Sequence, residues 1–235
     1  MKNNLNKQKN TELNNKQYVE NLMKIYSQYI DSDYANWSKN YMRNQFDFIG
    51  IRTPIRRKIT KQYFNEYGVP AKENLQDVIF TLWDLPEREY QKAALDLLEV
   101  VKKTLSVEDM PWLTSLILKK SWWDTVDVLS PHFAGYMFQT YPELIPKYAD
   151  QWILDENIWL QRAAILYQLS YKKNTDEERL FHYILTRADS KEFFVQKAIG
   201  WVLREYAKTT PSIVKDFVTS SNLRPLSKRE ALKNL

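Results

Sequence analysis

Gln91-Lys92-Ala93-Ala94-Leu95 is a short motif that this chain of 235 residues uses three times. It returns as Gln161-Arg162-Ala163-Ala164-Ile165 and as Gln196-Lys197-Ala198-Ile199-Gly200, at offsets of 70 and then 35 residues. Apolar residues around the motifs recur every three or four positions, which is the spacing of an amphipathic helix. A period near 35 residues in a helical chain is typical of stacked helix pairs that bury their apolar faces against their neighbours. The sequence therefore predicts an all-α fold, an α-solenoid (superhelix) of HEAT-like helix-pair repeats.

The composition agrees with a helical chain. It holds only 4 glycines, and the Val, Ile and Thr alternation that marks strands is nearly absent. We expect the prolines to mark helix boundaries; they are Pro54, Pro70, Pro86, Pro111, Pro131, Pro142, Pro146, Pro211 and Pro225. Residues 1–16 are rich in Asn, Lys and Gln and predict a disordered polar leader or a poorly ordered helix start. Residues 17–235 contain no linker and predict a single HEAT-like repeat domain.

Several classes of protein are excluded by what the sequence lacks. It has no cysteine, so disulfides and thiolate metal sites are excluded, and no apolar run long enough to cross a membrane. Without a secretory signal, the chain is expected in the cytoplasm. It contains no phosphate-binding glycine loop, no GxSxG elbow and no GxGxxG motif. His132 and His182 stand apart from any metal-ligand spacing, so we expect them at the surface or at helix caps and expect no metal.

The charges follow the same period as the motif. The chain carries a net charge of +5, and steps of 35 residues from Lys92 meet a charged residue at five positions: Arg57, Lys92, Asp127, Arg162 and Lys197. Equivalent positions in stacked repeats form a row along one face, commonly the concave one. The sequence thus predicts a concave basic face with a carboxylate at its middle, which suits a polyanionic partner. The alternative is that each charge marks the solvated edge of its helix.

Aromatic residues accompany the acid of this row. Trp123 lies one helical turn before Asp127, and Trp201 lies one turn after Lys197. Arg204 follows Lys197 by seven residues and so returns to the row. A carboxylate framed by indole rings suits a cationic transition state, because the acid opposes positive charge and the ring faces attract cations.

Further aromatic and acidic residues extend the pattern. Trp37 and Tyr41 share a helix face and could continue the aromatic wall, although ordinary core packing is the alternative for every one of these rings. We expect Trp122 to point into the core. We expect Asp124 to serve as a helix cap or in a surface salt bridge.

The sequence resembles the DNA alkylation repair glycosylases built from HEAT-like repeats, the AlkD-like enzymes, from about residue 18 to residue 233. The resemblance rests on these segments: Tyr41-Met42-Arg43-Asn44, Phe48-Ile49-Gly50-Ile51-Arg52-Thr53-Pro54, Ser121-Trp122-Trp123-Asp124-Thr125-Val126-Asp127, Trp159-Leu160-Gln161-Arg162-Ala163-Ala164-Ile165, Phe194-Val195-Gln196-Lys197-Ala198-Ile199-Gly200-Trp201-Val202-Leu203-Arg204-Glu205 and Leu226-Ser227-Lys228-Arg229-Glu230-Ala231-Leu232. The WWDxVD and QKAIGWxLRE patterns are the most specific of them.

This resemblance implies a monofunctional glycosylase that excises cationic N3- or N7-alkylated purines, such as 3-methyladenine and 7-methylguanine, from duplex DNA. It implies hydrolysis of the N-glycosidic bond without metal or cofactor, leaving an abasic site in an intact strand. Asp127 would be the catalytic carboxylate. Trp123, Trp201 and Tyr41 would line the lesion. Arg162 and Arg204 would hold the DNA backbone.

The chemistry of the residues is compatible with that activity. A cationic purine is already a good leaving group, so cleavage through an oxocarbenium-like state needs charge stabilisation more than strong acid catalysis. Arg57, Lys92, Arg162 and Lys197 would meet phosphates without sequence preference. We expect a monomer with no membrane partner. The alternative is a non-catalytic HEAT-like DNA-binding or protein-interaction scaffold, against which the lone acid in a basic row argues.

Overall fold

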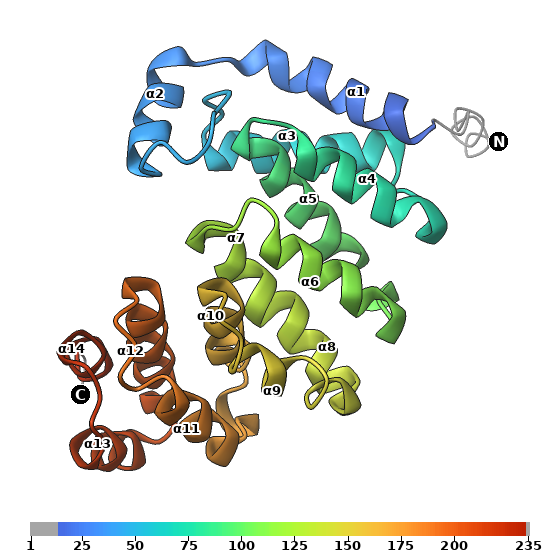
Figure 1. Cartoon of the computed structure of the whole chain (residues 1–235). Coiled ribbons are helices and arrows are strands. Elements are labelled where there is room, and N and C mark those ends of the chain that lie inside the picture. The colour runs from blue at the N-terminus through green and yellow to red at the C-terminus, as the bar shows by residue number, and fades with distance from the viewer. Residues whose placement is uncertain (1–13, 234–235) are drawn as a thin grey trace. The chain divides into compact units, whose positions relative to one another are not determined.

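A computed structural model describes residues 14–233, and in that range the chain is helical (Figure 1). No strand forms among these residues, and extended pairing is limited to one bridge between Asp47 and Glu87. This confirms the all-α prediction. The predicted leader lies outside the described residues except at its end, where α1 begins two residues early, at Asn15, with Asn14 as its cap.

The chain divides into two compact units, residues 1–104 and 105–235, and the single domain expected for residues 17–235 stays a prediction. The helices of the first unit are α1 Asn15–Tyr26, α2 Ser32–Tyr41, α3 Thr53–Tyr67, α4 Lys72–Asp84 and α5 Arg88–Val101. Helix α1 packs on α3 and α4, and α5 packs on the same two helices. The buried side chains of α5 recur at helical spacing, so its apolar face forms much of this core.

The second unit continues the repeat. Its helices are α6 Met110–Leu118, α7 Trp123–Val128, α8 Gly135–Thr140, α9 Ala149–Trp152, α10 Ile158–Leu166, α11 Glu177–Thr186, α12 Phe193–Ala207, α13 Pro211–Ser220 and α14 Pro225–Ala231. Helix α10 packs against both α7 and α12, and α12 packs against α14, so these helices form a row (Figure 1).

The spacing of the helices confirms the 35-residue period. Helices α3, α5, α7, α10 and α12 begin at Thr53, Arg88, Trp123, Ile158 and Phe193, each 35 residues after the one before. Every charged residue of the predicted row is consequently the fifth residue of its helix. The row is therefore a true structural register along the chain.

The prolines behave as predicted, with one exception. Pro54, Pro111, Pro211 and Pro225 stand at the first or second position of their helices. Pro131 was expected at a boundary, and this is wrong, because helical backbone runs on from α7 to α8 through a π-helical turn, Leu129–Ala134. Proline has no N–H to bond the carbonyl four residues before it, and a wider turn absorbs that gap.

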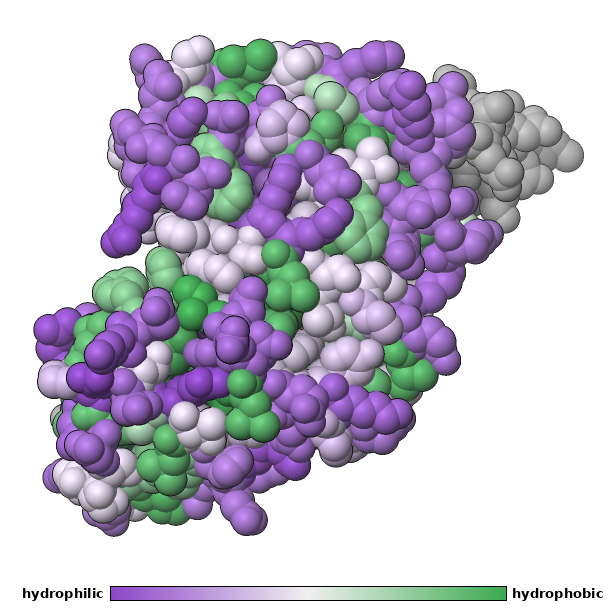
Figure 2. Space-filling model, in the orientation of Figure 1, coloured by the Kyte–Doolittle hydropathy of each residue, from purple (hydrophilic) through white to green (hydrophobic). Residues whose placement is uncertain are grey.

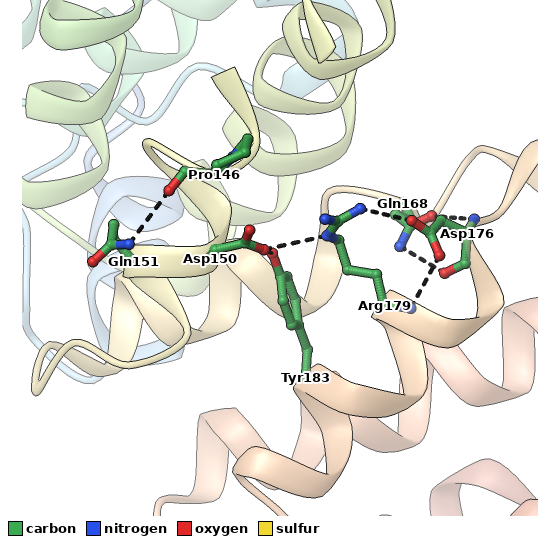
Figure 3. A network of polar contacts seen from close by, with 7 residues as sticks. All are labelled: Pro146, Asp150, Gln151, Gln168, Asp176, Arg179 and Tyr183. Carbon is green, nitrogen blue, oxygen red and sulfur yellow. Dashed lines mark hydrogen bonds and ion pairs between the residues drawn. The ribbon is translucent and has the colours of Figure 1, made fainter. Parts of the chain in front are cut away.

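A polar network ties α9 and the turn that follows α10 to α11 (Figure 3). The Asp150 carboxylate accepts hydrogen bonds from the Tyr183 hydroxyl and from Arg179 Nε at 3.2 Å. Arg179 also donates to the carboxylate of Asp176, the cap of α11, at 2.7 Å, and the Gln168 side chain bonds the backbone of the same residue. Burial and the bond to Asp150 raise the pKa of Tyr183, so its hydroxyl stays a donor.

In the part of the chain that the structure describes, no helix combines the length and apolar character needed to cross a bilayer. On the face shown in Figure 2, hydrophobic residues form small separate patches among hydrophilic ones.

Glu89 on α5 anchors the loop that precedes α3. Its buried carboxylate accepts hydrogen bonds from the backbone N–H groups of Ile49, Gly50 and Ile51, at 3.1, 2.8 and 3.1 Å. Gly50 has a φ of 97°, and a Cβ there would lie 2.0 Å from the carbonyl oxygen of Asp31. The loop therefore requires both the glycine and the acid.

Glu89→Ala is expected to lower the free energy of unfolding by about 3 kcal/mol, because it leaves three buried N–H groups without their acceptor. Urea denaturation measures this change. Glu66→Ala, the same substitution at an exposed position of α3, should change the free energy by less than about 0.5 kcal/mol. Equal losses in the two variants would contradict the anchoring role.

Candidate functional site

An ion pair lies at the centre of the predicted charged row. The Asp127 carboxylate on α7 accepts two hydrogen bonds from Arg162 on α10, from Nε to Oδ1 at 2.7 Å and from Nη2 to Oδ2 at 2.9 Å. The two side chains are 17% and 5% exposed, respectively. Arg162 Nη1 also donates to the backbone carbonyl of Phe194 on α12. One guanidinium thus joins three successive helices of the row and fixes both oxygens of the acid.

Arg162 was expected to hold the DNA backbone, and that role stays a prediction. It is buried, and three of its five N–H groups donate to protein acceptors. A signal for the pairing was present in the sequence. Opposite charges 35 residues apart stand at equivalent positions of adjacent repeats, where they can meet.

The predicted indoles belong to α7 and α12, which also contribute groups bonded to Arg162. Trp123 is the first residue of α7, one turn before Asp127, and Trp201 is on α12, one turn after Lys197. Both side chains are partly exposed, as is the carboxylate of Asp127. Helix α10 packs against both helices that carry them. The acid and the two indoles thus lie on neighbouring parts of one helical row.

A second aromatic cluster, which we call the Trp122 cluster, consists of Trp122, Trp159 and Phe194. The ring of Trp122 lies 5.6 Å from that of Trp159 and 5.1 Å from that of Phe194, and those two are 5.0 Å apart. Trp122 was expected in the core but is only half-buried, and its Nε1 has no acceptor among the described residues. The Arg162 guanidinium lies 6.0 Å from the Phe194 ring, so the cluster supports the ion pair from one side.

The other predicted cations of this unit share one carboxylate. Glu230 on α14 accepts from Lys197 Nζ and from Arg204 Nη1, each at 3.0 Å from the same Oε2 atom. The two cations lower the pKa of Glu230, with the Lys197 hydrogen bond as the largest cause. Gly200 allows α14 to come this close, because a Cβ there would lie 2.4 Å from Glu230 Cβ. Sequence reasoning did not single out Glu230.

In the first unit, Tyr41 ends a stack of rings on α2. Its ring, on a residue that is 59% exposed, lies 5.3 Å from the ring of Trp37, which lies 5.4 Å from that of Tyr34. The guanidinium of Arg52 lies 4.3 Å from the Tyr34 ring centre on its other side. The shared face predicted for Trp37 and Tyr41 is confirmed, and Trp37 is exposed rather than packed in a core.

The remaining candidate residues differ in how far they are exposed. Arg57 on α3 is exposed, and Lys92 on α5 is half-buried. Asp124, expected to serve as a helix cap or in a surface salt bridge, is buried in the first turn of α7. His132 and His182 are exposed, as predicted. Among residues 14–233, no cluster of three His, Asp or Glu side chains could hold a metal ion.

Comparison with known proteins gives a consistent set of relatives. The model of a family described as "DNA alkylation repair enzyme" matches residues 22–235. A solved structure described as a predicted DNA alkylation repair enzyme from Enterococcus faecalis is 34% identical, with a TM-score of 0.82, over 88% of this chain and 96% of that one.

Two more distant solved structures share the fold. AlkD2 from Streptococcus mutans is 18% identical, with a TM-score of 0.64, over 94% of this chain and 99% of that one. The smu.31 protein from Streptococcus mutans UA159 is 16% identical, with a TM-score of 0.58, over 89% and 99%. No curated protein matches the sequence significantly.

Proposed function

Because the chain belongs to the DNA alkylation repair enzyme family, we propose that it is a monofunctional DNA glycosylase. In this proposal it removes cationic N3- or N7-alkylated purines, such as 3-methyladenine and 7-methylguanine, from duplex DNA. The N-glycosidic bond is hydrolysed, and an abasic site remains in an intact strand. The protein acts as a monomer in the cytoplasm and needs no cofactor.

The observation that carries this proposal is the partly exposed carboxylate of Asp127, held at both oxygens by Arg162. As the bond to an alkylated purine breaks, the base leaves as a neutral molecule and positive charge develops on the sugar. A carboxylate fixed beside the sugar stabilises that charge without having to reorganise during the reaction. In this proposal the same carboxylate also accepts a hydrogen bond from the water that attacks the sugar.

Arg162 serves as a positioning residue in this mechanism. Two parallel hydrogen bonds define the plane of the carboxylate as well as its place, which a single bond would not do. The guanidinium also reduces the net negative charge of the site. The site is therefore suited to a substrate whose base already carries a positive charge and needs only modest further stabilisation.

The other candidates supply binding. Trp123 and Trp201 offer aromatic faces to the cationic base and the developing sugar cation. Tyr41, with its exposed ring, is proposed as a further contact to the damaged DNA. Lys197, Arg204, Arg57 and Lys92 are proposed to meet backbone phosphates, which gives affinity that does not depend on sequence.

The test is release of free bases from methylated duplex DNA in the presence of EDTA. We expect mass spectrometry to detect 7-methylguanine or 3-methyladenine, and a denaturing gel to show strand breaks only after the abasic sites are cleaved with alkali. Salt-sensitive DNA binding without release of any base would reject the glycosylase and favour the scaffold alternative.

A further inference from the structure

Lys197, Arg204 and Glu230 form a compact cluster in which the acid is the most buried member. Their side chains are 36%, 24% and 13% exposed, respectively. Both cationic nitrogens lie 3.0 Å from one carboxylate oxygen, so they are at most about 6 Å from each other. Two cations at this separation repel each other, and the acid between them offsets that repulsion.

The cluster keeps donors available for a further anion. The Lys197 ammonium has three donors, and one of them is used by Glu230. Arg204 uses Nη1 for both the carboxylate and the backbone carbonyl of Glu230, at 3.0 and 3.2 Å. Its Nε and Nη2 groups make no hydrogen bond with another described residue, and the cluster retains a net charge of one positive unit.

Helix α14 packs closely against α12. Gly200 lets it lie directly against α12, and Ser227 Oγ donates to the carbonyl of Gln196 at 3.1 Å. Glu230 is thus fixed by packing on the side of α12 that carries both cations.

We propose that Glu230 is a positioning residue that holds Lys197 and Arg204 together as a site for one backbone phosphate of duplex DNA. The two cations present their remaining donors to the phosphate, and the more deeply buried acid keeps them converged. The identity of the anion rests on the proposed function, because that function brings DNA to this unit. A carboxylate is thereby expected to strengthen the binding of a polyanion.

The direction in which DNA affinity changes when Glu230 is removed distinguishes positioning from the other possible roles. If Glu230 acted only as a negative charge near DNA, or occupied the place of a phosphate, its removal would tighten binding. As a positioning residue, it would weaken binding when removed, even though the protein gains positive charge.

Glu230→Gln is the variant that tests this direction. Its affinity for a short undamaged duplex is measured by fluorescence anisotropy over a range of salt concentrations. We expect the dissociation constant to rise about fivefold at low salt. The slope of log affinity against log salt should fall by about one, because one phosphate contact is lost. Glu143→Gln makes the same chemical change at an exposed residue, and it should leave the affinity unchanged or slightly higher.

A double-mutant cycle separates positioning from a general effect on the fold. In a Lys197→Ala/Arg204→Ala background, Glu230→Gln should have no further effect on DNA affinity. An equal loss in that background, or unchanged or tighter binding by the single variant, would overturn the proposal.

Base release by the wild type is measured in a separate assay, and it tests only the proposed function. A wild type that releases no base while Glu230→Gln still weakens duplex binding would reject the glycosylase and support the phosphate site. A wild type that releases base beside a Glu230→Gln variant that binds normally would reject only the phosphate site.

Discussion

Asp127→Asn is expected to lower the single-turnover rate of base release by about a hundredfold or more, while duplex binding changes little. The substitution keeps the shape of the side chain and one acceptor for Arg162, so the local fold should persist. It removes the negative charge that opposes the developing sugar cation. Quantifying free 7-methylguanine at saturating enzyme measures the chemical step apart from DNA affinity.

The matched control for this variant is Asp216→Asn on α13, where the acid is exposed. It makes the same change in net charge and should alter the release rate by less than about twofold. If Asp127→Asn released base as fast as this control, Asp127 could not be the catalytic carboxylate.

Arg162→Met is expected to lower the free energy of unfolding by about 3 kcal/mol or more, because it removes the guanidinium that forms two hydrogen bonds with the partly buried Asp127 carboxylate. It also removes the donor to the carbonyl of Phe194. Base release should fall as well, since the carboxylate is no longer held in place. Urea denaturation and the release assay measure the two effects.

Two further variants identify the cause. In an Asp127→Asn background, Arg162→Met should lower the free energy of unfolding by at least about 1 kcal/mol less, because the charged partner of Arg162 is already absent. Arg162→Lys keeps the charge but cannot make two parallel bonds, so its stability should be intermediate. If the main role of Arg162 were to bind a DNA phosphate, Arg162→Met would weaken DNA binding and leave the free energy of unfolding unchanged.

Much of the fold could be predicted because the structural repeat is recognisable as a recurring sequence motif. The motif at Gln91 and its two copies indicate the period, and the five helices that carry the charged row begin 35 residues apart. Pro131 was misjudged because a proline usually ends a helix, and nothing local showed that a π-helical turn would accommodate it.

The candidate site was predicted less completely, because its side chains meet across helices. The register placed Asp127 and Arg162 at equivalent positions, but which acceptor a guanidinium chooses depends on packing. Glu230 was missed for a different reason. Helix α14 begins 32 residues after α12 instead of 35, so its acid falls outside the register in which the other charges were found.

The π-helical turn at Leu129–Ala134 has a consequence for how this protein can vary in length. Each residue of an α-helix advances the chain by about 100° around its axis, so the wider turn sets the rotational phase between Asp127 and the buried Met137 and Phe138 of α8. Removing one residue there would swing either the acid or those core side chains through more than a quarter of a circle. Length changes in the loops between helices carry no such rotational cost.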